Sequence, residues 1–396
     1  MRVNVGIDVA KDTHWVVAVN EQGEVLLDRA LDNAPSAIEQ LIADLGRLGG
    51  ERVVGVDMLG GIATLVCAML LVAGEKVVHV PGLVVNRARQ GFSGGEKKSD
   101  PRDALVIADQ VRVRRDLRPV TLESEDLAAL RLLVARRREL VADQTRRVSR
   151  LHDLLVSIHP GLERVVDLTN KGSLWLLTRY VTPEEIRRGG LSRLTRHLKQ
   201  AGGVRNVGEL AEKALAAARE QTVAVPGERV AAGLCREHAR EALAARERIA
   251  SLDRELEELL DRHPDGALVR SLPGMGAVLA SEFLVETGDL RRFAGPDALA
   301  AAAGLAPVLR QSGRQRFLRR ALGGAKALKR VFYQSAFVSL RTPESRAFYD
   351  RKRREGKRHH QAVLCLARRR IDVLWAILRD RKPYQAPVPV QEAACA

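Results

Sequence analysis

Four aspartates within the first 103 residues have the chemistry to hold a metal ion together. Asp100 and Asp103 stand three residues apart at the start of a predicted helix, where positions i and i+3 share a face. Asp8 and Asp57 each close a short apolar run typical of a buried strand. Carboxylate oxygens without His or Cys are hard ligands, which suit Mg²⁺ or Mn²⁺. Four carboxylates gathered at one place repel one another unless a cation lies between them.

A purely structural explanation also fits these residues one at a time. Asp100 suits an N-cap, Pro101 suits the first helical position, and Asp103 suits the acid of a capping box. Asp8 or Asp57 alone is equally well explained as a surface acid at a strand end. All four in this order are harder to explain in that way, because one fold would bring them to a single edge of a sheet.

The first 120 residues predict a mixed α/β domain. A meander of three strands comes first, and helix and strand then alternate. The apolar runs place strands at 3–9, 15–19, 25–27, 52–57 and 76–80, helices at 36–48, 62–72, 83–90 and from 100 onward, and a glycine-rich loop at 91–98. This is the order of an RNase H-like fold, with a five-stranded mixed sheet and helices on both faces. Acids at the carboxyl ends of its central strands meet at one edge.

The remainder of the chain predicts mainly helices. Residues 127–159 form one long charged helix with an apolar stripe, and residues 167–259 are mostly helical. Because the apolar residues of 246–263 fall near heptad spacing, we interpret the two long helices as arms of an antiparallel, coiled-coil-like spacer. Further helices are expected at 299–304, 325–340 and 360–378, with a polar loop at 310–314.

A short motif, Leu272-Pro273-Gly274-Met275-Gly276, precedes an alanine-rich helix and resembles a helix-hairpin-helix turn. In such a turn the backbone N–H groups around Gly274 and Gly276 would hold a phosphate. An ordinary turn between two helices explains the motif equally well.

The charge of the chain is concentrated in one segment. The formal net charge is +16, and residues 310–382 carry 22 Lys and Arg against five Asp and Glu, a net charge of +17. A polyanion such as nucleic acid is therefore the first partner to consider. The four cysteines are far apart, which favours a reducing compartment and excludes a zinc finger. We expect no signal peptide and no membrane-spanning segment.

Taken together, these motifs resemble the DEDD transposases, or recombinases, of a large class of bacterial insertion sequences. The resemblance covers nearly the whole chain and rests on five motifs in this order: Gly6-Ile7-Asp8-Val9-Ala10-Lys11, Lys98-Ser99-Asp100-Pro101-Arg102-Asp103-Ala104, Leu272-Pro273-Gly274-Met275-Gly276, Gly304-Leu305-Ala306-Pro307 and Gln311-Ser312-Gly313. Such proteins pair an N-terminal RuvC-like domain with a C-terminal serine domain, and some are guided by an element-encoded bridge RNA. The second acid of the family is usually Glu, whereas the matching strand end here carries the shorter Asp57.

The resemblance implies a domain plan and a catalytic plan. The domains would be a RuvC-like α/β domain at 1–120, a helical spacer at 121–264, a serine transposase domain at 265–385 and a disordered tail at 386–396. Ser312 would attack a DNA phosphodiester and leave a phosphoserine link. The catalytic metal ligands for Mg²⁺ or Mn²⁺ would be Asp8, Asp57, Asp100 and Asp103. The DNA backbone would be bound by Arg310, Arg314, Arg316, Arg319 and Arg320.

The same resemblance implies the partners. They are donor and target double-stranded DNA, a structured guide RNA, and further copies of the chain in a homodimer or homotetramer. The setting would be the bacterial cytoplasm, at the nucleoid.

Two other interpretations stay open from the residues. A RuvC-like nuclease acting on branched DNA would use the four acids to activate water and would not need Ser312. A basic DNA- or RNA-binding scaffold would use the acids only as helix caps. A covalent protein–DNA adduct would separate strand transfer from both alternatives.

Overall fold

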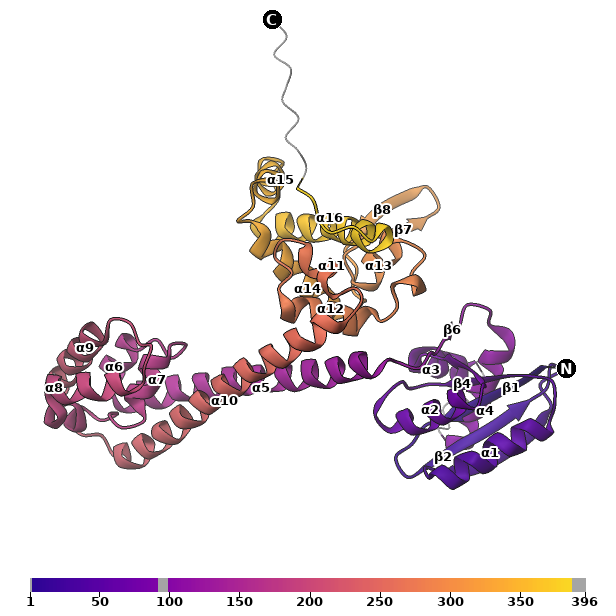
Figure 1. Ribbon diagram of the computed structural model, residues 1–396, viewed down its shortest axis with the longest axis horizontal. Coiled ribbons are helices and arrows are strands. Elements are labelled where there is room, and N and C mark those ends of the chain that lie inside the picture. Colours follow the sequence, from indigo (N-terminus) through magenta and orange to yellow (C-terminus); the bar gives the residue numbers. More distant parts are fainter. Residues whose placement is uncertain (1, 92–98, 387–396) are drawn as a thin grey trace, which may run out of the picture. The chain divides into compact units, whose positions relative to one another are not determined.

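The computed structural model describes residues 2–91 and 99–386 (Figure 1). The chain divides into two compact units, one up to Ser124 and one from Glu125 onward. The expected spacer and C-terminal domain both fall inside the second unit, so the boundary near residue 264 stays a prediction. The tail expected from 386 lies outside the described residues except for Ala386, and the expected glycine-rich loop lies outside them except for Gly91.

A mixed sheet forms the centre of the first unit. Its order is β3-β2-β1-β4-β5-β6, with β1, β4 and β5 parallel and the other pairs antiparallel. The strands are β1 (Arg2–Asp8), β2 (Thr13–Val19), β3 (Val25–Asp32), β4 (Glu51–Val56), β5 (Lys76–His79) and β6 (Arg118–Pro119). The expected meander and crossovers are confirmed. The expected count of five was wrong, because the exposed two-residue edge strand β6 has no apolar alternation that would reveal it.

Helices cover both faces of this sheet. On one face, α1 (Pro35–Arg47) and α2 (Thr64–Val72) bury their apolar side chains against β1 and β4. A short 3-10 turn, η1 (Gly61–Ala63), leads into α2. On the other face lie α3 (Gly82–Gln90) and α4 (Asp100–Val113), whose apolar residues pack on β2, β4 and β5. The result is the three-layer α/β arrangement that the sequence predicts.

Two glycines let α4 approach the sheet closely. Gly6 on β1 pairs with Gly55 on β4. A Cβ atom on Gly6 would lie 2.1 Å from the Ala104 carbonyl oxygen, and one on Gly55 would lie 2.4 Å from a Val111 methyl group. A side chain at Gly6 would meet the backbone of α4, and one at Gly55 would meet side-chain methyl groups of α4, so this glycine pair allows the helix to lie close to the strands.

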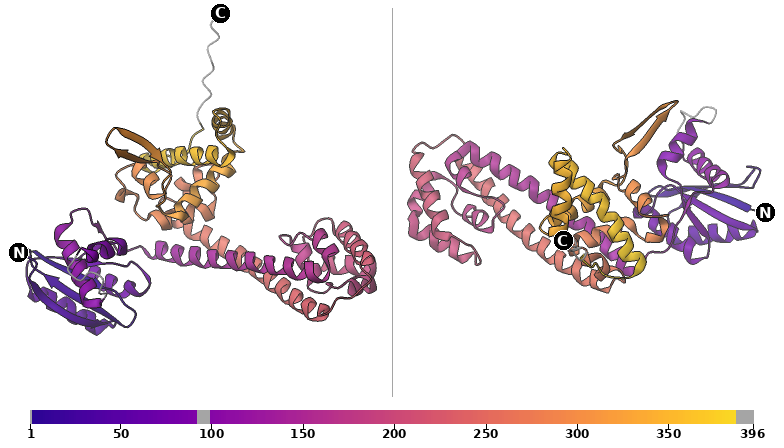
Figure 2. Two further views of the ribbon diagram at one scale, coloured as in Figure 1. Left: turned by 180° about the vertical axis from the view of Figure 1, so that it is seen from behind. Right: turned by 90° about the horizontal axis from the view of Figure 1, so that it is seen from above.

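The second unit contains a pair of long antiparallel helices, α5 (Glu125–Ile158) and α10 (Glu228–Arg262), which lie side by side in Figures 1 and 2. Three ion pairs give the register: Arg262 with Asp126 at 3.1 Å, Arg137 with Asp253, and Arg147 with Glu241 at 3.0 Å. Successive ion-pair residues along α5 contact residues of decreasing number on α10, so the expected antiparallel arrangement is observed. The coiled-coil-like packing stays a prediction.

Four shorter helices close one end of this pair around a separate apolar core. They are α6 (Pro160–Val165), α7 (Lys171–Leu177), α8 (Pro183–Gln200) and α9 (Val207–Glu220). Thr182 and Glu185 form a reciprocal capping box at the start of α8. This end of the molecule therefore folds around its own buried leucines and alanines.

A second helical cluster follows α10. It comprises α11 (Gly266–Ser271), α12 (Ala277–Thr287), the 3-10 turn η2 (Leu290–Arg292), α13 (Pro296–Ala302), α14 (Lys326–Ser339), α15 (Pro343–Arg354) and α16 (His359–Asp380). Between α13 and α14 the chain forms a hairpin of β7 (Val308–Ser312) and β8 (Gln315–Arg319). The loop expected at 310–314 was wrong for 310–312, which belong to β7, and only Gly313 and Arg314 form a turn. Four charged or polar residues around a glycine give no apolar alternation that would indicate an exposed strand. Within the described residues, no helix is long and apolar enough to cross a membrane.

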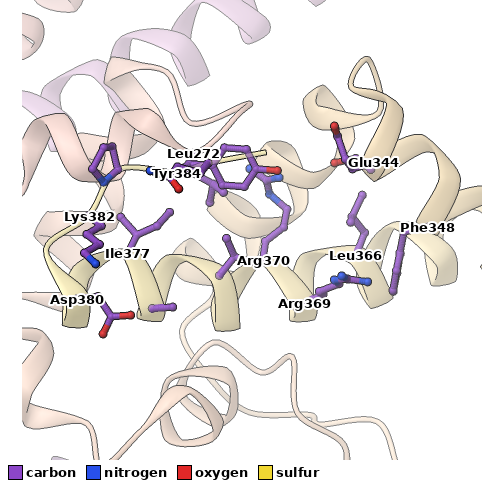
Figure 3. A pocket seen from close by; sticks show the side chains of 15 residues that line it. Leu272, Glu344, Phe348, Leu366, Arg369, Arg370, Ile377, Asp380, Lys382 and Tyr384 are labelled. Carbon is purple, nitrogen blue, oxygen red and sulfur yellow. The ribbon is translucent and has the colours of Figure 1, made fainter. Parts of the chain in front are cut away.

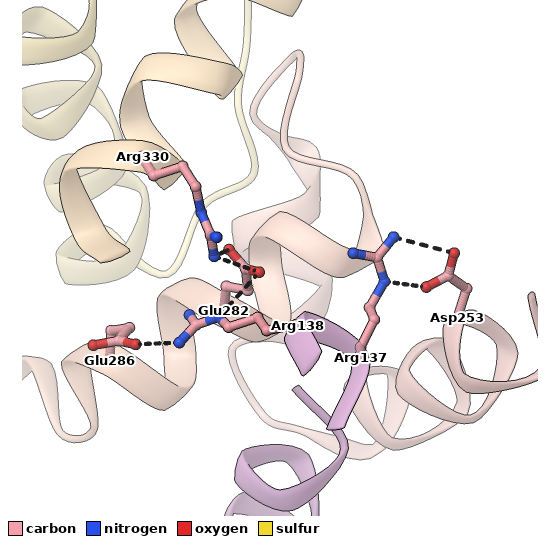
Figure 4. A network of polar contacts seen from close by, with 6 residues as sticks. All are labelled: Arg137, Arg138, Asp253, Glu282, Glu286 and Arg330. Carbon is pink, nitrogen blue, oxygen red and sulfur yellow. Dashed lines mark hydrogen bonds and ion pairs between the residues drawn. The ribbon is translucent and has the colours of Figure 1, made fainter. Parts of the chain in front are cut away.

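Ion pairs centred on a buried glutamate join this cluster to α5 (Figure 4). The side chain of Glu282 on α12 is 5% exposed, and Arg330 Nη2 on α14 lies 2.8 Å from both of its oxygens. Arg138 on α5 contacts Glu282 at 3.4 Å and Glu286 at 3.0 Å. Because breaking a buried pair leaves a stranded charge, this network fixes α12 and α14 against the long helix.

Candidate functional site

The sheet brings Asp8 and Asp57 to one edge. Asp8 ends β1, and Asp57 directly follows β4, whose last residue Val56 pairs with Ile7. Side chains two residues apart on a strand point to the same face. The Cβ positions of Gly6 and Gly55 point toward α4. Asp8 and Asp57 therefore share the face that α4 covers.

The start of α4 adds Asp103 to this edge. Ala104, the next residue, lies directly over Gly6, and the Asp103 side chain is buried at 7% exposure. Asp100 lies one turn earlier, is exposed, and is itself the first residue of the helix. Ser99 is the N-cap, so the capping role considered for Asp100 was wrong. We call Asp8, Asp57 and Asp103 the acidic edge.

At the acidic edge, Asp57 and Asp103 lie close enough for their charges to interact. Burial raises the pKa of Asp57, and the nearby charge of Asp103 raises it further, while the Val9 N–H and the charge of His79 act in the opposite direction. The Val9 N–H lies 3.4 Å from Asp57 Oδ1. Asp57 is thus a partly buried carboxylate beside a second carboxylate, which is an environment that a cation would relieve.

Arg89 at the end of α3 is the cation that Asp103 contacts. Its Nη1 lies 2.7 Å and 2.8 Å from the two carboxylate oxygens. Within residues 2–91 and 99–386, no three His, Cys, Asp or Glu side chains are arranged to hold a metal ion. The oxygen-only set suits a hard divalent cation in its chemistry. The four-aspartate metal site stays a prediction.

Two residues of this site were not identified in the sequence. His79 ends β5 opposite Val56, and its Nε2 lies 3.3 Å from the Asp57 carbonyl oxygen. Burial lowers the pKa of His79. A polar residue at the end of a third parallel strand is the signal that could have revealed it. Arg89 belongs to no motif, and only its contact with Asp103 identifies it.

Ser312 lies at the tip of the exposed β7–β8 hairpin, which we call the serine hairpin (residues 308–319). It ends β7 and pairs with Gln315 across a two-residue turn. Gly313 has φ +54°, and of the two turn residues it alone has a positive φ, which is the pattern of a type II′ turn. The glycine of Gln311-Ser312-Gly313 therefore has a backbone reason that is independent of chemistry.

The hairpin register sorts the predicted arginines. Residues that alternate along a strand share a face, and cross-strand partners share it too. Arg310 and Arg319 therefore lie on the face of Ser312, Arg316 lies on the opposite face with Gln311, and Arg314 lies in the turn. Arg320 follows the hairpin and is exposed. Although these arginines are close in sequence, they lie on two opposite faces of the hairpin.

The root of the serine hairpin is held tightly although its tip is exposed. Gly304 and Gly324 lie back to back, since a Cβ on Gly324 would be 2.5 Å from the Gly304 nitrogen. The Ala325 N–H donates to the Ala302 carbonyl oxygen at 2.7 Å, and Lys329 Nζ donates to the Gly304 carbonyl oxygen at 3.1 Å. The Gly304-Leu305-Ala306-Pro307 motif therefore anchors the start of the hairpin.

The Leu272–Gly276 turn joins α11 to α12 and packs on α14. Gly274 has φ +80°, and a Cβ there would lie 2.6 Å from the Ser335 carbonyl oxygen, which explains this glycine by packing. Gly276 is the exposed N-cap of α12. A phosphate-binding role for either glycine stays a prediction.

Arg370 on α16 hydrogen-bonds to this turn and lines a cavity of about 370 Å³ (Figure 3). It donates to the Pro273 carbonyl oxygen and, at 3.0 Å and 2.8 Å, to Ser335 Oγ. Burial lowers its pKa to about 10. Since its hydrogen bonds go to oxygens of the turn and of α14, we assign Arg370 to the support of the fold.

Comparisons with known proteins match both parts of the chain. Residues 5–160 match the transposase family DEDD_Tnp_IS110, and residues 266–350 match the transposase family IS116/IS110/IS902. Among solved structures, T. thermophilus RuvC in complex with a Holliday junction substrate is similar over 30% of this chain and 100% of that chain. The identity is 18% and the TM-score 0.24, values too low to support an argument.

Full-length relatives are also found. An uncharacterized 44.8 kDa protein of insertion element IS116 from Streptomyces clavuligerus is 43% identical, covering 99% of this chain and 98% of the relative. An uncharacterized 42 kDa protein of insertion element IS900 from Mycobacterium paratuberculosis is 41% identical, covering 96% of each. With two family matches and full-length relatives at this identity, the chain belongs to the IS116/IS110/IS902 family of insertion-sequence transposases.

Proposed function

We propose that this transposase cuts and rejoins DNA through Ser312, with a divalent metal held at the acidic edge. The single observation that carries the proposal is the pairing, in one transposase chain, of a carboxylate edge with an exposed serine that shares its hairpin face with Arg310 and Arg319. Each part alone has a structural explanation. Together they would provide a nucleophile, a phosphate-binding surface and a place for a metal.

The covalent step balances as a transesterification. Ser312 Oγ attacks the phosphorus, its bond to phosphorus forms, and the bond to one strand oxygen breaks. The serine proton leaves, and the departing strand oxygen takes up a proton. Attack by a strand hydroxyl on the phosphoserine link then rejoins DNA and restores Ser312.

Residues of this chain would position the reacting groups. Arg310, two residues from Ser312 on the same face, would hold the phosphate through charge-assisted hydrogen bonds, and Arg319, at the far end of that face, would contact the neighbouring DNA backbone. Asp8, Asp57 and Asp103, with Asp100 one turn away, would hold Mg²⁺ or Mn²⁺. When bound, the metal would supply Lewis acidity for the charge that develops on the phosphate and the leaving oxygen.

The partners follow from the same proposal. The +17 segment at 310–382 would bind the backbones of donor and target DNA. The serine hairpin and the acidic edge belong to different units of the chain, so a homodimer or homotetramer could combine them from different copies. A structured guide RNA would select the target by base pairing.

The test is to trap the covalent adduct. Purified protein is incubated with DNA carrying its own element ends and Mg²⁺, and denatured protein is then examined for attached DNA. Ser312→Ala should lose the adduct and recombination while keeping the melting temperature, because an exposed hydroxyl-to-methyl change costs little stability. Ser157→Ala, at another exposed serine of the second unit, is the matched control and should keep both.

Asp103→Asn distinguishes the outcomes. It should abolish cleavage while leaving DNA binding nearly intact. Cleavage that needs Asp103 but survives Ser312→Ala would overturn the serine mechanism in favour of a metal-dependent nuclease. Cleavage that survives both substitutions would overturn the entire assignment.

A further inference from the structure

Arg89 already occupies one of the carboxylates that the proposed metal needs. Its Nη1 contacts both oxygens of Asp103, at 2.7 Å and 2.8 Å. The two side chains are 14% and 7% exposed, so the pair is largely withdrawn from water. An ion pair in such surroundings is screened much less than one on the surface. Asp103 is therefore compensated by a protein cation without any metal.

The contact with Asp103 uses only one of the three nitrogens of the Arg89 guanidinium. Arginine binds an oxyanion best through two nitrogens in parallel, whereas Arg89 reaches Asp103 through one nitrogen alone. Its Nη2 donates to Asn86 Oδ1 at 2.9 Å. Its Nε is buried and has no hydrogen-bond partner among the described residues. A buried donor without a partner is costly, so Arg89 has a reason to exchange this arrangement for a better one.

Among the described residues, Arg89 makes no hydrogen bond to the neighbouring carboxylate of Asp57. Asp57 Oδ1 accepts from the Val9 N–H at 3.4 Å, whereas the hydrogen bonds of Arg89 go to Asp103 and Asn86. A divalent cation between Asp57 and Asp103 would neutralise both. At the acidic edge the metal therefore has an advantage over the arginine.

We propose that Arg89 is a stand-in cation: it holds Asp103 until a divalent metal binds, and its released guanidinium then pairs with a phosphate of the bound DNA. The inference rests on the proposed function, because it takes the acidic edge to bind metal and DNA. No covalent bond changes in this exchange. Arg89 is a positioning residue at Asp103 and becomes a DNA-binding residue once the metal is present.

The first experiment measures Mn²⁺ affinity by titration calorimetry on the full chain without DNA. Arg89→Gln removes the competitor and should tighten Mn²⁺ binding about tenfold, the scale of one charge-assisted contact. Arg87→Gln, at an exposed position on the same helix, is the matched control and should leave the affinity unchanged. Equal or weaker Mn²⁺ binding by Arg89→Gln would overturn the proposal and make the pair a support for α3.

A melting measurement covers the case in which the variant folds poorly. Arg89→Gln strands a buried carboxylate, so it should melt below the wild type without metal. Saturating Mn²⁺ should raise its melting temperature by more than it raises that of the wild type. Arg89→Lys keeps a point charge without the fork and should have an intermediate Mn²⁺ affinity. An equal metal-induced rise in all three proteins contradicts competition.

Adding duplex DNA tests the second half of the exchange. In the wild type, DNA should tighten Mn²⁺ binding, because a phosphate takes Arg89 away from Asp103, and Arg89→Gln should lose this coupling. Equal coupling in both proteins overturns the phosphate contact.

Asp103→Asn distinguishes failure of the stand-in role of Arg89 from failure of the proposed metal site. If it weakens Mn²⁺ binding while Arg89→Gln has no effect, the metal site stands and the stand-in role fails. If Asp103→Asn has no effect either, the metal site fails as well.

Discussion

The acidic edge and the serine hairpin hold their functional residues in opposite ways. At the acidic edge, a paired set of glycines lets α4 press on the sheet, and Asp103 is buried against Arg89. In the serine hairpin, only the root is packed, and every residue from Val308 to Arg319 is exposed. The edge is shaped by its own unit, whereas the hairpin presents Ser312 on a surface that a partner can cover.

This difference indicates which interactions stabilise the conformation of each region. A two-stranded hairpin alone is marginal in water, and exposed apolar side chains such as Phe317 at 49% and Leu318 at 67% make it a surface that favours a partner. The acidic edge needs no partner for its shape, but its carboxylates need a cation. Substitutions in the packed glycines beneath the edge should therefore act mainly on stability, whereas substitutions at the exposed tip of the hairpin should act on activity and leave stability nearly unchanged.

The largest expected effect comes from a methyl group at Gly6. Gly6→Ala places a Cβ 2.1 Å from the Ala104 carbonyl oxygen, so α4 must move, and we expect a loss of about 3 kcal/mol or more in unfolding free energy. Gly313→Ala, with open space around it and φ +54°, should strain only the hairpin turn. Urea unfolding of both variants measures the difference. Similar losses in the two would remove the contrast between edge and hairpin.

The next effect tests the root of the hairpin. Gly324→Ala puts a Cβ 2.5 Å from the Gly304 nitrogen and should reduce recombination strongly, with about 1–3 kcal/mol of destabilisation from overpacking. Gly323→Ala, next to it, meets no atom within 4 Å and should resemble the wild type. Recombination assays and melting curves on both proteins check this. If Gly324→Ala recombines normally, the packed root does not position Ser312.

The contrast also explains which parts could be predicted from sequence. The strands that lead to Asp8 and Asp57 could be predicted, because a strand buried on both faces appears in the sequence as a continuous run of apolar residues. Arg89 could not be predicted, since its contact with Asp103 depends on how α3 packs beside α4. The sequence of the hairpin predicts a polar loop, because exposed strands need no apolar alternation. Ser312 was identified through the family resemblance, and its local sequence alone indicates only a turn.

A smaller effect concerns the pH dependence of the edge. The pKa of Asp57 is raised in the folded protein, so its contribution favours folding below the unfolded value of 3.8 and is lost as the pH rises through the folded pKa. Asp57→Asn keeps an acceptor for the Val9 N–H but carries no charge. Without metal, it should melt a few degrees above the wild type at pH 7, and the difference should vanish near pH 3. A constant difference across this range would show that charge is not the cause.

The smallest effect distinguishes the two faces of the serine hairpin. A phosphate attacked by Ser312 must lie on the Ser312 face, where Arg310 lies two residues away and Arg316 does not lie. Arg310→Gln should therefore reduce the slope of log K against log salt by about 0.9, the value of one lost phosphate contact. Arg316→Gln removes the same charge from the opposite face and should change the slope less. Because both variants lower the net charge equally, a general electrostatic attraction predicts equal changes, and only a phosphate held beside Ser312 predicts unequal ones. Equal slopes would leave the hairpin basic but without a preferred face, and would weaken the case that its geometry presents Ser312 to DNA.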